Sequence, residues 1–150
     1  MKRSPQQEKL EKMLQSSKFS ASGFLGQDTR SLWEIIDADA RELERLGVTK
    51  ETLAAQMQKI TDAGVAAMGD WTDFSDSLRV CVSDARGKIP CPWPHHVRCS
   101  KRITTVQCKI TGKTIKWADL NIHLIQDHGF FQGTGSPYRL EPEDLVTIIF

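Results

Sequence analysis

The stretch TTVQCKITGKTIKW, residues 104–117, decides the fold of this chain. Apolar residues alternate with polar ones on both sides of a turn that contains Gly112, and this is the pattern of a half-buried antiparallel hairpin. We predict strands over residues 105–110 and 114–117, with Val106, Cys108 and Ile110 on the apolar face of the first. The polar residues of the other face argue against a parallel sheet that is buried on both sides.

The sequence around this hairpin predicts a further strand and two short helices. Apolar and polar residues alternate again over residues 78–82, and residues 118–127 have the spacing of a helix that stops at Gly129. Pro142 then precedes a last short helix over about residues 143–148.

The first half of the chain predicts helices. One begins after Ser4, a second runs from residue 28 or 29 to 46, and a third runs from Thr49 to residue 68. Gly47 ends the second helix, so that the second and third helices form an antiparallel hairpin. The predicted inner face of the third helix consists of Leu53, Met57, Ile60 and Met68.

These patterns together predict an α+β protein, in which an N-terminal helical hairpin packs against a small, mainly antiparallel sheet with a C-terminal helix. A chain of 150 residues is long enough for one such core. We expect a single domain over residues 1–150, with a helical part over about 1–70 and a strand-rich part that contains the Cys and His residues over about 76–150.

The composition excludes several classes of protein. With 39% hydrophobic and 26% charged residues, the chain has ordinary globular usage, and it contains no apolar run that approaches a membrane span. The start of the chain has no apolar segment of a secretory signal, and four cysteines in a chain of this size are typical of a reducing compartment. We therefore expect a cytoplasmic protein without a membrane partner.

The cysteines and histidines are concentrated in one part of the sequence. All of them lie between Cys81 and His128, and seven fall within the 38 residues from Cys91 to His128. Zinc binds four thiolate or imidazole ligands, usually as closely spaced pairs. The segment 91–99 contains Cys91, His95, His96 and Cys99 and supplies one candidate pair; residues 123 and 128 supply the other. The candidate metal ligands are Cys91, Cys99, His123 and His128, and zinc is the candidate cofactor.

Two alternatives compete with a metal site. The histidines can be explained without an ion, since His123 lies one helical turn before Asp127 and His128 lies at a helix C-terminus, where a positive charge is favourable. Cys99 lies between cationic residues, which would lower its pKa and favour a reactive thiolate. The sequence assigns no catalytic residue, and an enzyme is the less favoured interpretation.

The same region is rich in positive charge. Between Arg79 and Leu120 there are nine basic residues against two acidic ones. Such a segment favours an anionic partner, of which a nucleic acid is one example, although lysines also protect the edges of sheets. The candidate anion-binding residues are Arg98, Lys101, Arg102, Lys113, Lys116 and Arg139.

The glycine-rich loop after residue 128 is the candidate ligand pocket. Small residues, hydroxyl groups and an arginine follow the helix-borne histidines, and only four residues separate the helix from Gly133. The candidate pocket residues are His123, His128, Ser136 and Tyr138. We therefore expect a small binding protein that contacts an anionic partner through residues 79–116. The alternative is a zinc-stabilised module, or a metal-dependent or thiol enzyme, that uses the Cys/His residues of 91–128.

Overall fold

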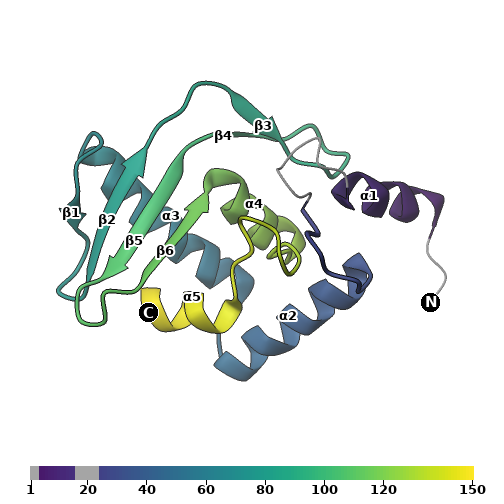
Figure 1. Ribbon diagram of the computed structural model, residues 1–150, viewed down its shortest axis with the longest axis horizontal. Helices are drawn as coiled ribbons and strands as arrows, with labels where there is room; N and C mark the ends of the chain where they lie inside the picture. The colour runs from purple at the N-terminus through teal and green to yellow at the C-terminus, as the bar shows by residue number, and fades with distance from the viewer. Residues whose placement is uncertain (1–3, 16–23) are drawn as a thin grey trace.

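The computed structural model describes residues 4–15 and 24–150 (Figure 1). Its helices are α1 (Pro5–Gln15), α2 (Leu32–Leu46), α3 (Lys50–Ala66), α4 (Asp119–His128) and α5 (Pro142–Ile149). Its strands are β1 (Thr72–Asp73), β2 (Leu78–Ser83), β3 (Lys88–Pro90), β4 (Arg98–Ser100), β5 (Ile103–Cys108) and β6 (Thr114–Ala118). The predicted α+β architecture, with an antiparallel sheet and a C-terminal helix, is confirmed. None of the described helices is long and apolar enough to cross a membrane.

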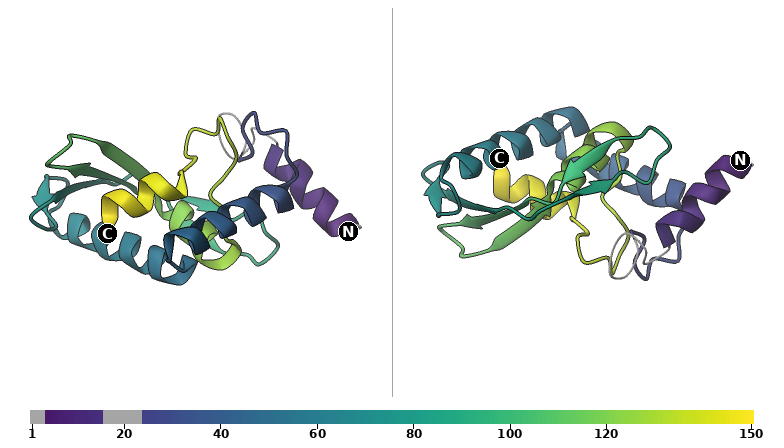
Figure 2. Two further views of the ribbon diagram at one scale, coloured as in Figure 1. Left: turned by 90° about the horizontal axis from the view of Figure 1, so that it is seen from below. Right: turned by 90° about the horizontal axis from the view of Figure 1, so that it is seen from above.

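The main sheet has the strand order β1-β2-β5-β6, with antiparallel pairing throughout. Its inner face packs against α3, and Figure 2 shows the sheet and this helix as two layers. Val80 lies opposite Val106 in the register, and both side chains are fully buried. The layers also share a buried polar contact, because the Trp117 indole donates to Thr61 Oγ1 at 2.9 Å.

The predicted helix boundaries hold where a cap defines them. Ser4 and Gln7 form reciprocal hydrogen bonds at the start of α1, and Thr49 Oγ1 accepts from the backbone of Thr52 at the start of α3. The predicted start of α2 at residue 28 or 29 is wrong, because Ser31 is the residue that caps this helix. Gly47 ends α2 in the left-handed conformation, as predicted.

Two apolar residues lie on the surface although the sequence predicts them on the inner face. The third helix ends at Ala66, and Met68 follows in the left-handed conformation with a side chain that is 91% exposed. Strand β5 ends at Cys108 instead of residue 110, so Ile110 belongs to the turn and is 83% exposed. In both cases the element stops before the periodic pattern does.

The short strands β1, β3 and β4 are absent from the sequence-based prediction. β3 and β4 form a separate two-stranded ribbon, in which Ile89 lies opposite Cys99. Its sequence has three prolines, at 90, 92 and 94, and no clear alternation, so strand periodicity does not reveal it. The ribbon packs on α4 and, with α1 and the start of α2, surrounds a second apolar cluster.

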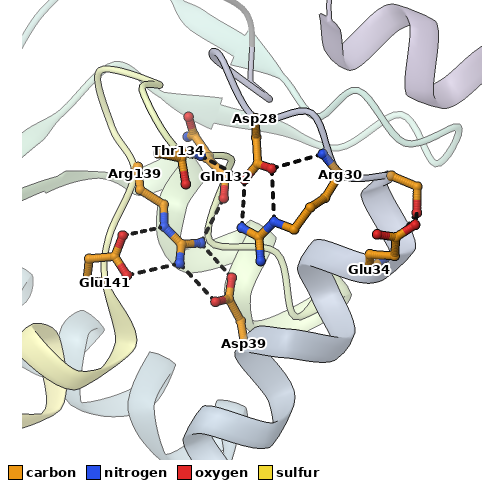
Figure 3. Close-up of polar contacts among 9 residues, drawn as sticks. Asp28, Arg30, Glu34, Asp39, Gln132, Thr134, Arg139 and Glu141 are labelled. Carbon is orange, nitrogen blue, oxygen red and sulfur yellow. Dashed lines mark hydrogen bonds and ion pairs between the residues drawn. The ribbon is translucent and has the colours of Figure 1, made fainter.

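The loop after α4 is fastened to the rest of the molecule by charged side chains (Figure 3). The guanidinium of Arg139 donates to both carboxylate oxygens of Asp39 in α2, to Glu141 and to the carbonyl of Gln132. Burial lowers the pKa of Arg139, but the hydrogen bonds with the two carboxylates outweigh it and hold the pKa above its usual value. This ion-pair network keeps the loop in one position beside α2 and α4.

The backbone of the loop also lies very close to the segment before α2. A Cβ atom added to Gly133 would lie 2.1 Å from the carbonyl oxygen of Leu25, and the Gly133 amide donates to Phe24 at 2.8 Å. Asp28 accepts from the amide of Thr134, and its hydrogen bond with Arg30 keeps the pKa of Asp28 well below its usual range. The glycine-rich composition of the loop is therefore explained by close backbone packing.

Candidate metal centre

The loop between β3 and β4 positions the first two side chains of the centre. The Cys91 amide donates to the carbonyl of Val97 at 2.8 Å and so continues the hydrogen bonding of the ribbon by one further pair. The turn inside this pair has the sequence Pro92–His96, in which the two prolines restrict φ and the His95 amide donates to Trp93 at 2.9 Å. Cys91 and His95 are thereby held on the side of the ribbon that faces α4.

Helix α4 positions the other two side chains. His123 lies in its middle, His128 is its last residue, and Gly129 ends the helix in the left-handed conformation. Five positions correspond to about 140° around a regular helix, so the two rings do not start from one face. They converge nevertheless, with ring centroids 5.4 Å apart, since both side chains lean toward His95.

The ligand atoms of Cys91, His95, His123 and His128 all lie within 4.8 Å of one another. The Nε2 atom of His95 lies 3.2 Å from Nε2 of His123 and 3.4 Å from Nε2 of His128. The Sγ atom of Cys91 lies 3.6 Å from Nε2 of His128.

Three of the six distances among these atoms match the edges of a zinc coordination tetrahedron. With Zn–N bonds of about 2.0–2.1 Å and a Zn–S bond of about 2.3 Å, tetrahedral angles place two nitrogens about 3.3–3.4 Å apart and a sulfur about 3.6 Å from a nitrogen. The two N–N distances are 3.2 and 3.4 Å, and the S–N distance is 3.6 Å.

Hydrogen bonds among the same atoms account for only part of this arrangement. A neutral imidazole nitrogen is either a donor or an acceptor, so His95 Nε2 has at most one proton to share between its two histidine neighbours. His128 Nε2 also faces both His95 and the thiol of Cys91. One cation at the centre would accept a lone pair from all four atoms at once.

Neighbouring side chains contact two of the histidine rings of the cluster. Asp127 Oδ2 lies 3.4 Å from Nδ1 of His123, the ring nitrogen that faces away from the cluster. A carboxylate on the far nitrogen fixes the tautomer of a metal-binding histidine and makes it more basic. On the other side, Trp93 stacks on the His128 ring with centroids 4.0 Å apart and also contacts Phe130.

The protonation of the metal-free centre follows from its burial. Burial raises the pKa of the Cys91 thiol to about 11 and lowers the pKa of His128 to about 4. It also lowers the pKa of His123, against the opposing charge of Asp127. At neutral pH the thiol is therefore protonated, whereas His123 and His128 are neutral and ready to donate a lone pair.

The structure brings together three of the four candidate metal ligands that the sequence analysis names. Cys91, His123 and His128 belong to the cluster, whereas Cys99 lies two ladder pairs further along β4, and His95 takes the fourth place. The sequence signal for His95 was its spacing from Cys91. Three residues lie between Cys91 and His95, whereas seven lie between Cys91 and Cys99. Short spacing is the stronger indication of a zinc pair.

The expectation that Cys99 carries a reactive thiolate is wrong in its premise. Burial raises the pKa of the Cys99 thiol, and the charges of Asp119 and Asp127 raise it further. The neighbouring cations of the sequence do not offset this, since Arg98 is exposed on the strand. A thiol in this environment stays protonated and is a poor nucleophile at neutral pH.

The four residues of the predicted ligand pocket lie in different surroundings. His123 and His128 belong to the Cys/His cluster. Ser136 donates to the side chain of Gln132. Tyr138 lines a cavity, and neither His123 nor His128 is among the residues that the structure shows around this cavity. The shared pocket that the sequence indicates therefore stays a prediction.

The predicted anion-binding residues are also dispersed. Lys113 lies in the turn between β5 and β6, and Lys116 lies in the middle of β6, opposite Thr105. Arg139 is engaged by Asp39 and Glu141, and Arg102 lies 3.3 Å from Asp119. Arg98 begins β4 and Lys101 directly follows this strand, so both belong to or adjoin the β3–β4 ribbon.

Comparison with known proteins found no matching family model, no similar curated protein and no similar solved structure. The function therefore has to be inferred from the geometry of the centre itself.

Proposed function

We propose that this chain is a zinc-binding module, with Cys91, His95, His123 and His128 as the ligands of a single structural ion. The observation that carries the proposal is the agreement of three donor–donor distances with tetrahedral edges. Nitrogen and thiolate donors in tetrahedral geometry favour zinc over magnesium or calcium, which prefer oxygen ligands in larger shells.

The ligand set supports a structural role for the ion. Four protein ligands close the coordination shell, whereas catalytic zinc sites use three and leave the fourth position for water or substrate. The ion would join the β3–β4 ribbon to α4, in addition to the apolar contacts that these two elements already share in the second cluster. The role resembles that of a disulfide, since it fastens a small segment with little core of its own.

Elemental analysis of the protein, purified without a histidine tag, tests the proposal. We expect about one zinc per chain, and a cobalt-substituted sample with the absorption of a tetrahedral ion bound to one thiolate. A protein that holds no stoichiometric metal, and whose spectrum with cobalt lacks the thiolate band, would contradict it.

The pH dependence of zinc binding follows from the protonation of the ligands. Because the pKa of Cys91 is raised to about 11 and that of His128 is lowered to about 4, zinc displaces one proton from the thiol and none from His128 at neutral pH. We expect zinc affinity to rise about tenfold per pH unit between about pH 7 and pH 9. Calorimetry in buffers of different ionisation enthalpy measures the number of released protons, and release of none would contradict the thiolate ligand.

We propose a second function, the binding of an anionic molecule. The surface proposed for it is smaller than the whole segment 79–116 that the sequence indicates. Lys88, Arg98 and Arg102 line a groove of about 550 Å³ beside the metal centre, together with His123 and Gln126. Within the described residues, neither Lys88 nor Arg98 forms an ion pair. The groove therefore presents two uncompensated positive charges next to the metal-bound ribbon.

Binding to a single-stranded oligonucleotide across a salt series tests this surface. With about two phosphate contacts, the logarithm of the association constant should fall with the logarithm of salt concentration with a slope of about −1.4. The double substitution of Lys88 and Arg98 by Gln should weaken binding, while the matched substitution of Lys113 and Lys116 should not. Equal effects of the two pairs, or no binding at low salt, would reject the groove as the site.

A further inference from the structure

A second site is indicated by a cavity that is lined at the start of α4 by Leu120 and Asn121. It has a volume of about 360 Å³, within the range of about 300–1,000 Å³ that small-molecule sites occupy. Its walls are mainly apolar and come from distant parts of the chain, with Phe24, Ile103 and Leu120 among them. None of the proposed metal ligands is among its described lining residues.

The polar groups that line the cavity differ in what they can still bind. Asn121 already forms a hydrogen bond at each of its amide atoms, since its Oδ1 accepts from the amide of Ala118 and its Nδ2 donates to the carbonyl of Tyr138. The two hydrogen bonds therefore hold the Asn121 side chain in one position at the edge of the cavity. It connects the start of α4 to the loop that the Arg139 network holds in place.

The amide nitrogen of Gln132 can donate a hydrogen bond to a bound molecule. The side-chain oxygen of this residue accepts from Ser136, so that the amide nitrogen is the part left for another partner. The residue is 3% exposed and has a φ of 70°, a left-handed conformation that is uncommon for a residue with a side chain. Such conformations are found preferentially at binding sites.

The remaining polar groups at the cavity are the ammonium of Lys101 and the hydroxyl of Tyr138. Among the residues that the structure describes, neither group forms a hydrogen bond or an ion pair. No carboxylate is among the described lining residues. The cavity thus combines apolar walls with a cation, an amide donor and a hydroxyl. Its described lining residues include no anionic group that could accept hydrogen bonds from them.

We propose that this cavity binds a small organic carboxylate with an apolar body, whose carboxylate is bound by Lys101, Tyr138 and the amide of Gln132. The apolar body replaces water against Phe24 and Leu120, and the carboxylate supplies the acceptor that the three groups lack. The proposal does not depend on the metal, and it assigns the loop after α4 a role in binding rather than only in packing.

A matched pair of probes tests the proposal on the protein as purified. 4-Phenylbutyrate and 4-phenylbutan-1-ol share the same apolar body and differ in the charged group, so calorimetry with both isolates the contribution of the carboxylate. We expect 4-phenylbutyrate to bind about tenfold more tightly than the alcohol. Amide chemical-shift changes should concentrate at residues of the cavity, such as Leu120 and Gln132.

Two variants locate the site. Lys101→Met keeps the aliphatic stem and removes the charge, so it should lower the affinity for 4-phenylbutyrate about tenfold and leave that for the alcohol unchanged. Ala85→Trp places bulk at an exposed residue of the cavity lining and should weaken both probes. Lys113→Met, on the distant hairpin, is the matched control and should change neither.

The proposal is overturned if neither probe binds at millimolar concentration, or if acid and alcohol bind equally well. It is also overturned if Lys101→Met and Lys113→Met have the same effect on the acid. Because Lys101 and Ala85 are both exposed, their substitution leaves the core of the fold unchanged.

Discussion

Removal of zinc by a chelator should lower the Tm of the protein by about 10 °C. Free zinc at about 1,000 times its dissociation constant stabilises the folded state by about 4 kcal/mol. For a chain of this size, each kcal/mol changes Tm by about 2–4 °C. The comparison uses thermal melts of the protein as purified, after chelation, and after addition of zinc to the chelated sample.

The loss of structure should be local. The core between α3 and the main sheet contains its own buried side chains, including Val80, Val106 and Trp117, and none of the proposed ligands. Hydrogen exchange in the metal-free protein should therefore speed up at the Cys91 amide and in the ribbon, while amides of β2 and β5 stay protected. An unchanged Tm together with unchanged exchange at Cys91 would show that no ion stabilises the ribbon.

Cys91→Ser provides the control for this experiment. The variant keeps the size of the side chain but replaces the thiolate with a weak zinc ligand. Its melting temperature should be close to that of the chelated protein and should respond little to chelator. A chelator effect that persists in this variant would come from a metal bound elsewhere.

The sequence predicts the architecture well because the decisive patterns are local. The alternation of apolar and polar residues over 104–117 indicates that one face of the sheet is buried. Thr49 and Gly47 mark helix ends through hydrogen bonds to neighbouring residues. Met68 and Ile110 are misplaced for the opposite reason. Each continues a local period after the chain has left the element, and only the three-dimensional structure determines where that happens.

The candidate centre was only partly predictable from the sequence. Residue type and spacing single out Cys91, His123 and His128, but the choice between His95 and Cys99 depends on the ribbon. With Ile89 opposite Cys99, the pairing leaves Cys99 on the strand and places His95 in the turn that faces α4. The pairing of three-residue strands next to prolines has no periodic signal in the sequence.

Substitution of His95 should therefore have a far larger effect on zinc binding than substitution of Cys99. Loss of a residue that only orients a ligand typically costs about 10–100-fold in metal affinity. Removal of a ligand itself should cost more, so we expect His95→Ala to weaken zinc binding by more than about 100-fold. Competition with a chromophoric chelator at pH 7.5 measures the affinity of each variant.

His96→Ala and Cys99→Ser are the matched controls. His96 is the exposed neighbour of His95, and Cys99 is the cysteine that the sequence favours as a ligand. Both variants should bind zinc within about threefold of the unmodified chain, because neither side chain lies among the clustered ligand atoms. If Cys99→Ser weakened binding as much as His95→Ala, the thiol of Cys99 would be a ligand after all. The ribbon would then have to shift its register to bring that sulfur to the ion.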